Sequence, residues 1–284
     1  MDLTVFLVML VSAATQAGWN VILKIRLDPF SALVLVGICG GVAALPFALW
    51  FGLPGLDVLP WIGLSVCCHL SYYAFIIGAY SRADLGMAYP VARGSALLMT
   101  AGISIFIMGE AISPVGMVGI LLLASSILLV GRHAFDRHAL GHALEGRALL
   151  LALGSGVAAT AFTIVDGTAA RVTGQANLYT TWLFVADAVV ITILLLSWKG
   201  RRAVAPLLTF LPWGLLGGTM LFVSYWLSVW AMTQAPIGLV TAVRESSVLF
   251  GAILSVTLLR EPLRADRVIA AFLVVSGLAL IKLF

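Results

Sequence analysis

Charged residues are scarce in this chain: lysine, arginine, aspartate and glutamate together make up 10% of its 284 residues. A soluble domain carries about a quarter of its residues as charged side chains, because these cover its surface. So little charge excludes an ordinary soluble protein. The net charge of only +4 also gives no reason to expect a nucleic-acid partner.

Cysteine is rare, and the common metal and nucleotide motifs are missing. The three cysteines, Cys39, Cys67 and Cys68, lie in apolar stretches, where an odd number of them makes neither a disulfide framework nor a zinc site. The sequence contains neither HExxH nor a glycine-rich loop that ends in Lys-Ser or Lys-Thr. We therefore expect no metal, no cofactor and no catalytic residue.

Long apolar runs are what the chain has in their place. Hydrophobic residues make up 62% of it, and the mean hydropathy is +1.13. Runs of roughly 20 apolar residues recur from end to end, and each is long enough to cross the hydrocarbon core of a bilayer. We predict an all-α polytopic membrane protein with ten transmembrane helices in contact with lipid. The predicted spans are 3–25, 30–52, 58–81, 85–108, 113–131, 147–170, 177–198, 208–233, 237–259 and 265–283. The first run lacks a basic segment before it, so it is interpreted as a helix and not as a cleaved signal.

Basic residues are divided unevenly between the two sides of these spans. Twelve lysines and arginines fall in or beside the connections that follow the odd-numbered spans, whereas Arg171 and Lys282 alone belong to the other side. Because cytoplasmic loops carry the excess of basic residues, the odd-numbered connections are predicted to be cytoplasmic. Both termini should then face away from the cytoplasm.

Two arginines interrupt apolar spans at matching positions. Arg93 and Arg244 each stand 17 residues before a glutamate, which is Glu110 in one case and Glu261 in the other. Each half of the chain would contain five spans, so the second copy must enter the membrane inverted relative to the first. We predict a first five-helix repeat over 1–131, a cytoplasmic linker over 132–146 and a second repeat over 147–284. Inverted repeats that frame a site near the midplane are a recurring transporter design.

An arginine inside a membrane is costly, so it indicates either function or tight structural pairing. Arg93 is about seven residues into its span, which is roughly 11 Å from the cytoplasmic side at 1.5 Å per residue. Arg244 is equally deep from the opposite side, so the two guanidiniums are predicted on either side of the midplane. They either bind the anionic group of a solute by paired hydrogen bonds or hold the bundle together.

Several segments carry a resemblance to a known family. They are Trp19-Asn20 in the first span, YPVARG over 89–94, VRESS over 243–247, and the two glutamates with the small residues that follow them. In these segments the chain resembles the EamA-type transporters of the drug/metabolite transporter superfamily. Members have two five-helix units, a glutamate at the end of the fourth helix of each, and glycines 9 and 16 positions later. Here Gly119 and Gly277 keep one glycine in each unit, while Ser126 and Ala270 replace the other.

The resemblance implies a solute cavity between the first, third and fourth helices and the sixth, eighth and ninth. His69 fits the pocket and the core equally well, and the aromatic residues could instead form interfacial belts. Glu245, His69 and Asp166 are candidates for carrying a coupling proton. An ion pair is equally open for Glu245, and solute contact or an interfacial or capping role is equally open for Asp166. The candidate substrate-binding residues are Trp19, Asn20, His69, Tyr72, Tyr89, Arg93, Trp226 and Arg244.

Other residues are interpreted as structural. Glu110 and Glu261 end their helices, where a carboxylate does not complement the helix dipole, so a bond to the following helix or loop is expected. Gly119 and Gly277, which match glycine positions of the family, are also interpreted as structural. Asp187 lies mid-span without a nearby base, so it needs a partner from another helix or a raised pKa; a structural role is favoured because the seventh helix of the family is usually peripheral.

The function predicted from all of this is secondary transport by alternating access. The solute would be a small metabolite with an anionic group, with amino acids as the first choice, exported across the inner membrane of a bacterium with both termini in the periplasm. A proton is a candidate partner, and a monomer suffices because it contains both halves. The alternatives are an exporter of lipophilic or cationic drugs, a lipid-carrier flippase of the same superfamily, and an intramembrane enzyme. The enzyme is disfavoured because the sequence shows no nucleophile–base pair.

Overall fold

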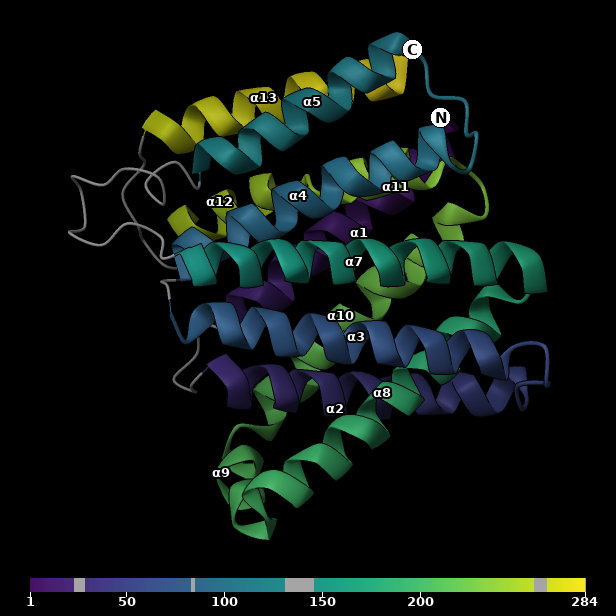
Figure 1. Cartoon of the computed structure of the whole chain (residues 1–284), viewed down its shortest axis with the longest axis vertical. Helices are drawn as coiled ribbons and strands as arrows, with labels where there is room; N and C mark the ends of the chain where they lie inside the picture. Colours follow the sequence, from purple (N-terminus) through teal and green to yellow (C-terminus); the bar gives the residue numbers. More distant parts are fainter. Residues whose placement is uncertain (23–28, 83–84, 131–145, 258–264, 284) are drawn as a thin grey trace.

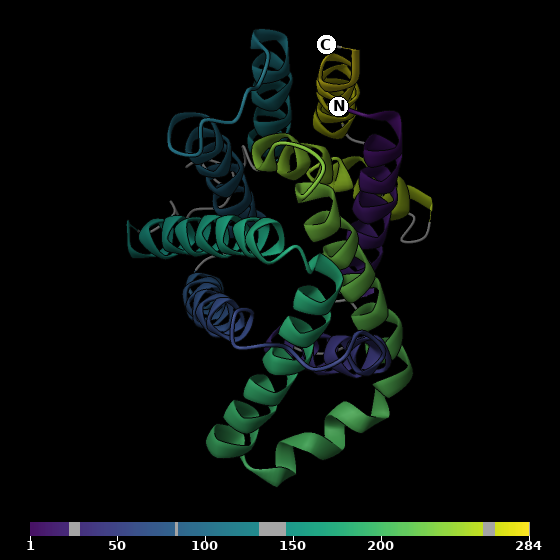
Figure 2. The same ribbon diagram turned by 90° about the vertical axis from the view of Figure 1, so that its right-hand side faces the viewer.

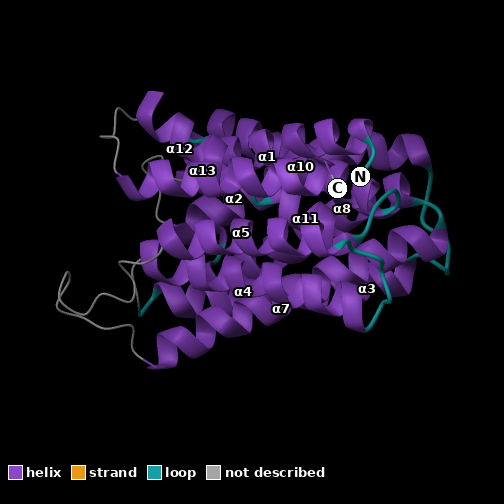
Figure 3. Cartoon of the chain, turned by 90° about the horizontal axis from the view of Figure 1, so that it is seen from above, coloured by secondary structure: helices purple, strands orange, loops and turns teal. Residues whose placement is uncertain are grey.

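The computed structural model describes residues 1–22, 29–82, 85–130, 146–257 and 265–283, and the regular structure within those ranges is helical (Figure 3). The first half of the chain forms α1 (Leu3–Ile22), α2 (Pro29–Phe51), α3 (Leu59–Tyr80), α4 (Leu85–Phe106) and α5 (Pro114–Val130). The second half forms α7 (Gly146–Thr173), α8 (Ala176–Lys199), α10 (Leu211–Met232), α11 (Ile237–Arg244), α12 (Ser247–Thr257) and α13 (Ala265–Leu283). A 3₁₀ turn, η2 (Arg201–Ala203), and the short helix α9 (Val204–Thr209) join α8 to α10.

Among the described residues, seven of these segments are long and apolar enough to cross a membrane, with α11 and the start of α12 counted as one. Three shorter apolar segments, Pro90–Phe106, Pro114–Leu129 and Val268–Leu283, coincide with the remaining predicted spans. The helical membrane class predicted from the apolar runs is therefore confirmed. The inverted relation of the two halves stays a prediction.

Local sequence explains where several helices begin and end. Pro60 and Pro212 stand at the first turns of α3 and α10, where the missing N–H of proline costs nothing because that group has no partner within the helix. Gly109, after α4, and Gly174, after α7, have φ values of 68° and 66°. This left-handed conformation favours glycine, because a side chain there would be strained.

The most extensive contacts between helices join the first half of the chain to the second (Figures 1 and 2). Helix α2 packs on α8, α3 on α7, α5 on α13 and α1 on α10, while α4 packs on both α7 and α11. The interior of the molecule is therefore an interface between the two halves. A residue that points into it can meet partners from either half.

Helices α1 and α10 are joined by a reciprocal pair of serine hydrogen bonds. The hydroxyl of Ser12 donates to the carbonyl of Ser224 at 2.7 Å, and the hydroxyl of Ser224 donates to the carbonyl of Ser12 at 2.8 Å. The hydroxyls of Ser12 and Ser228 also lie 2.9 Å apart. Small hydroxyl-bearing residues allow membrane helices to approach closely and satisfy one another's polar groups, so this contact fixes α1 against the second half.

Both chain termini lie at the same end of the bundle (Figure 1). The last turn of α5 and the first turn of α7, between which the predicted linker falls, lie at the opposite end. This arrangement agrees with an even number of crossings.

Candidate functional site

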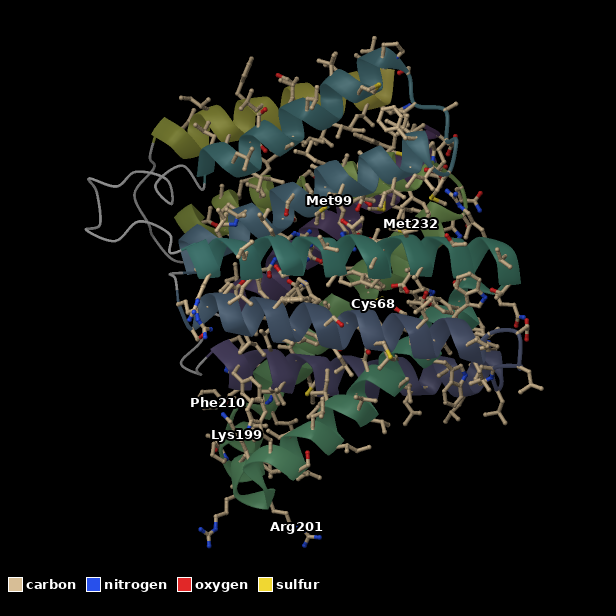
Figure 4. The ribbon with its side chains drawn as sticks, viewed as in Figure 1. Cys68, Met99, Lys199, Arg201, Phe210 and Met232 are labelled. Atoms are coloured by element: carbon tan, nitrogen blue, oxygen red, sulfur yellow. The ribbon has the colours of Figure 1, made fainter. Side chains whose placement is uncertain are left out.

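Charged side chains and one histidine lie inside the helical spans, at the interface between the halves. Figure 4 shows nitrogen- and oxygen-bearing side chains among α3, α4, α7 and α10, around the labelled Cys68, Met99 and Met232. Among the described residues no group of three or more histidine, cysteine, aspartate or glutamate side chains could hold a metal ion. The mid-span set consists of His69 on α3, Arg93 on α4, Asp166 on α7, Asp187 on α8, Arg244 at the end of α11, and Glu245 after it.

Arg93 and Glu245 form an ion pair that joins the first half of the chain to the second. The guanidinium of Arg93 donates to Oε1 of Glu245. The Arg93 side chain is 11% exposed and that of Glu245 only 4% exposed. A buried pair of this kind is costly to break from one side, because the remaining charge is then left without a partner. Arg93 is therefore held by protein in this conformation, and a solute must displace Glu245 to reach it.

The helix that carries Arg244 and Glu245 is interrupted next to them. The sequence predicts one helix over 237–259, but the structure has α11 ending at Arg244 and α12 beginning at Ser247. The backbone tightens there: the N–H of Ser246 donates to Val243, and that of Val248 donates to Glu245, each three residues back. A 3₁₀ turn inside a long helix often marks a hinge. Apolar content alone gave no sign of this break, so the single predicted helix is corrected.

Arg244 is buried against an aromatic ring of α10. Only 4% of the residue is exposed, and its guanidinium carbon lies 5.6 Å from the ring centroid of Tyr225, a distance at which the cation is attracted by the ring. The hydroxyls of Thr241 and Ser246, on either side of Arg244 in the chain, are buried and have no hydrogen-bond partner among the described residues. Buried donors without partners are unusual, so these two hydroxyls are available to bind a polar group of a ligand.

Asp166 is fully buried and accepts hydrogen bonds from two tyrosines. The hydroxyl of Tyr179, on α8, donates to its Oδ1 at 2.6 Å, and the hydroxyl of Tyr225, on α10, donates to its Oδ2. The sequence left solute contact and an interfacial or capping role open for Asp166. In the structure its carboxylate joins α7 to α8 and α10.

His69 and Asp187 bind each other. Nδ1 of His69 lies 2.7 Å from Oδ2 of Asp187, and the histidine ring also contacts Phe162 and Tyr225, with centroids 4.4 Å and 6.0 Å away. Asp187 was expected to need a partner from another helix, and His69 is that partner. Because α8 turns this carboxylate towards α3, Asp187 belongs to the polar interior and not to a peripheral surface.

The other predicted substrate-binding residues are more dispersed. Trp19 and Asn20 are partly buried on α1, and the indole N–H of Trp19 has no hydrogen-bond partner among the described residues. The ring of Tyr72 packs edge-on against Phe162, with centroids 5.8 Å apart. Trp226 packs on Phe222 and donates to Asn177 at 2.8 Å, so it belongs to an aromatic cluster between α2 and α10. The side chain of Tyr89 lies outside the described residues.

Glu110 joins α4 to the second half of the chain. Its carboxylate accepts hydrogen bonds from the hydroxyl of Ser104 and from the N–H of Ile237 at 2.8 Å, and it forms an ion pair with Arg171. The sequence predicted a bond to the following helix or loop. The partners come instead from α7 and from the first turn of α11, where the unpaired N–H groups and the helix dipole attract a carboxylate.

Arg171 extends this contact to the end of α10. Arg171 donates to the carbonyls of Met232, at 2.7 Å, and Ala235, at 2.9 Å, where α10 ends. We call Glu110, Arg171 and the first turn of α11 the Glu110 clasp. Glu261 lies outside the described residues.

Gly119 and Gly277 face each other where α5 crosses α13. A Cβ atom added to Gly119 would lie 2.8 Å from the carbonyl oxygen of Gly277, and one added to Gly277 would lie 2.8 Å from the carbonyl oxygen of Gly119. Contacts that short do not occur in folded proteins without a shift of the backbone. The two glycines therefore permit the close approach of these helices.

Sequence reasoning missed the two tyrosines of Asp166 and the partner of Glu110. Tyr179 and Tyr225 lie in apolar runs that give no polar periodicity, and Arg171 was used only to count charge on one side of the membrane. One indication of such interhelical contacts was present in the sequence: Asp187, which has no nearby base in its own span, needed a partner from another helix. An apolar notch lined by Ile22, Leu35, Val36, Phe210 and Trp213 among others has no ionisable lining, and we do not locate the site there.

Comparison with known proteins agrees with the fold. Residues 146–283 match the model of the EamA-like transporter family. A solved structure described only as the crystal structure of a protein aligns with a TM-score of 0.77 and 17% identity, over 99% of this chain and 98% of that chain. It is one of 28 matching chains, and at this identity it is evidence for the fold alone. No curated protein matches the sequence significantly.

Proposed function

We propose, because the chain belongs to the EamA-like transporter family, that it exports a small metabolite with an anionic group, and that amino acids are the class to test first. Membership makes it a multi-pass membrane transporter of small molecules and not an enzyme, which removes the intramembrane-enzyme hypothesis. The solute, the direction of transport, the bacterial inner membrane and the periplasmic termini are parts of the proposal.

The pattern of helix contacts supports two inverted repeats. In an inverted repeat, α1 would correspond to α7, α2 to α8, α3 to α10, α4 to α11 with α12, and α5 to α13. Exchanging the two halves then turns the contact of α3 with α7 into a contact of α10 with α1. The contact of α4 with α7 likewise becomes that of α11 and α12 with α1, and all of these contacts exist. A two-fold relation of this kind suits alternating access, in which one half rocks against the other around a central site.

One observation carries the choice of solute: Arg93 and Glu245 present opposite charges to each other between the halves. A zwitterionic amino acid can replace this pair by two pairs, with its carboxylate on Arg93 and its ammonium group on Glu245. No charge is then left without a partner, so the cost of separating a buried ion pair is offset. A simple anion would leave Glu245 without a counter-charge, and a simple cation would leave Arg93 without one.

The surroundings of the pair offer further donors for such a solute. Arg244 lies next to Glu245 in the chain, and the hydroxyls of Thr241 and Ser246 and the indole N–H of Trp19 lack partners among the described residues. The 3₁₀ turn at Glu245 is where this helix can bend as the halves move. The solute cavity is proposed between α1, α3 and α4 of one half and α7, α10 and α11 of the other. A proton is proposed as the coupling ion, and a monomer is proposed to suffice.

The test is a binding measurement with sets of matched compounds. Amino acids are added one at a time to the detergent-solubilised protein. For each of them, parallel samples contain the matching α-keto acid, which lacks the ammonium group, or the matching amine, which lacks the carboxylate. A compound that binds only the folded protein raises its melting temperature. We expect at least one amino acid to raise the melting temperature, and its keto acid and amine to have no effect at the same concentration.

Two results would overturn the zwitterion proposal. If a keto acid stabilises the protein as well as its amino acid, the site recognises a simple anion. If only lipophilic cations stabilise the protein, the alternative of a drug exporter is favoured. Glu245→Gln and Arg93→Gln should each abolish the response to the amino acid, while Asp57→Asn, an exposed carboxylate in the loop before α3, should leave it unchanged.

A further inference from the structure

A second set of ionisable groups surrounds Tyr225, separate from the Arg93–Glu245 pair. Asp166 accepts a hydrogen bond from the Tyr225 hydroxyl, and Arg244 lies over its ring. The ring of His69 lies 6.0 Å from that of Tyr225, and Asp187 is bonded to His69. We call these four side chains, Asp166, Arg244, His69 and Asp187, the Tyr225 cluster. They come from α7, α11, α3 and α8.

The charges of this cluster do not balance unless it holds a proton. Asp166 and Asp187 bring two negative charges, and Arg244 brings one positive charge. With a neutral His69 the net charge is −1; with a protonated His69 it is zero. Arg93 and Glu245 already balance each other, and the remaining charged side chains of the described residues lie towards the helix ends. A net charge buried in a membrane is strongly unfavourable, so the balance favours one bound proton.

Hydrogen bonding places that proton on His69. Asp166 already accepts from both Tyr179 and Tyr225, and an ionised carboxylate is a stronger acceptor for two donors than a neutral carboxylic acid. Protonated His69 donates directly from Nδ1 to Asp187, 2.7 Å away, and this charge-assisted bond is stronger than a neutral one. The other titratable groups near this pair are phenols and a thiol, which are neutral near pH 7 in their ordinary state: Tyr72, Tyr73, Tyr179, Tyr225 and Cys68.

We propose that the His69–Asp187 pair is a binding site for one exchangeable proton, and that this proton is the one coupled to transport. Each half contributes one member, since α3 belongs to the first half and α8 to the second. Movement of the halves that separates the two side chains removes the carboxylate from His69 and releases the proton. The binding of the proton stands without any assumption about the solute, whereas the coupling rests on the proposed function.

The protonation of His69 can be observed directly by nitrogen NMR. The chain has four histidines, and the other three, His133, His138 and His142, lie in the predicted linker. A variant in which these three are changed to glutamine leaves His69 as the single histidine and touches none of the residues proposed to bind solute or proton. Labelling of this variant with 15N-histidine then gives one pair of ring signals.

At pH 7.5, where a histidine with an ordinary pKa near 6.5 is mostly neutral, we expect the imidazolium signals of a doubly protonated ring. Asp187→Asn in the same background should convert them to those of a neutral ring, while Asp57→Asn should leave them unchanged. A neutral His69 at this pH in the protein that retains Asp187, or an imidazolium that survives Asp187→Asn, would overturn the assignment.

Coupling is tested separately in proteoliposomes. With a transported amino acid inside, an imposed pH difference should change the rate of efflux of the wild-type protein, and His69→Gln should make its own rates with and without the pH difference equal. If efflux of the variant still follows the pH difference, His69 does not carry the coupled proton. If the NMR result holds but no amino acid is transported, the proposed function fails and the proton site remains.

Discussion

For single residues, the mid-span charges that the structure describes meet partners from other helices, and three ion pairs join the two halves of the chain: Arg93–Glu245, His69–Asp187 and Glu110–Arg171. The partners are distant in sequence: 152 residues separate Arg93 from Glu245, and 118 separate His69 from Asp187. A helix that moves relative to the rest must therefore break or exchange such a contact. Under the proposed mechanism, stability and transport depend on the same side chains.

The two hydrogen bonds into Asp166 give a test of this dependence. Tyr179→Phe and Tyr225→Phe each remove one donor from a buried carboxylate, so each should lower the free energy of unfolding by about 1–3 kcal/mol. In an Asp166→Asn background the penalties should become smaller, since the charge that needed the donors is gone. Unfolding in detergent measures all four combinations for each tyrosine. Penalties that are equal in both backgrounds would mean that the tyrosines act independently of Asp166.

The Glu110 clasp gives a second test at this scale. Glu110→Gln removes the negative charge that Arg171 and the first turn of α11 share. Because the Arg171 side chain is 30% exposed, solvent replaces part of the lost interaction, and we expect a loss of about 1–3 kcal/mol. Asp57→Asn serves as the control and should change stability by less than about 0.5 kcal/mol. An equal effect of the two substitutions on the melting temperature would show that the clasp contributes no stability.

At the level of helices, the sequence predicted which segments are apolar helices but not how they bend or pair. Apolar length is a local property, so these segments could be predicted from runs of residues. The interruption at Glu245 coincides with the ion pair between Glu245 and Arg93 on α4, a contact between the halves that the length of an apolar run does not encode. Asp187 illustrates the limit, because its need for a partner was evident from the span while the partner, His69, depended on how α3 and α8 pack.

The crossing of α5 and α13 is tested by adding one methyl group. Gly119→Ala places a Cβ against the carbonyl of Gly277, so the helices must separate, and overpacking of this kind costs about 1–3 kcal/mol. Gly102→Ala on α4 is the matched control, since a Cβ there meets no atom within 4 Å and alanine favours helix by up to about 1 kcal/mol. The expected result is a lower melting temperature for the first variant and an unchanged or higher one for the second.

At the scale of the whole molecule, the uneven division of basic residues predicts the orientation of the bundle. Both termini lie at one end, and the basic connections should place the other end in the cytoplasm. Arg201, in the turn after α8, extends away from the bundle (Figure 4) and should lie on the cytoplasmic side. The candidate site at the centre would then be reached from each side in turn as the halves move.

Reporter fusions test this orientation. Alkaline phosphatase, which is active only outside the cytoplasm, should be active when fused after Phe284 and inactive when fused after Gly200. Green fluorescent protein should give the opposite pattern at the same two positions. Phosphatase activity at Gly200 together with fluorescence at the C-terminus would mean that the bundle is inserted the other way round.

Under the proposed function, Arg93 and Glu245 separate from each other and bind the two charged ends of a zwitterionic solute. The most direct test is the exchange of a radiolabelled amino acid across proteoliposomes that contain the purified protein. Loss of a charge-assisted contact worth about 1.5–3 kcal/mol corresponds to a ten- to hundredfold decrease, so Arg93→Gln and Glu245→Gln should each slow exchange by that factor, while Asp57→Asn retains the wild-type rate. Wild-type exchange by either of the first two variants would contradict the account.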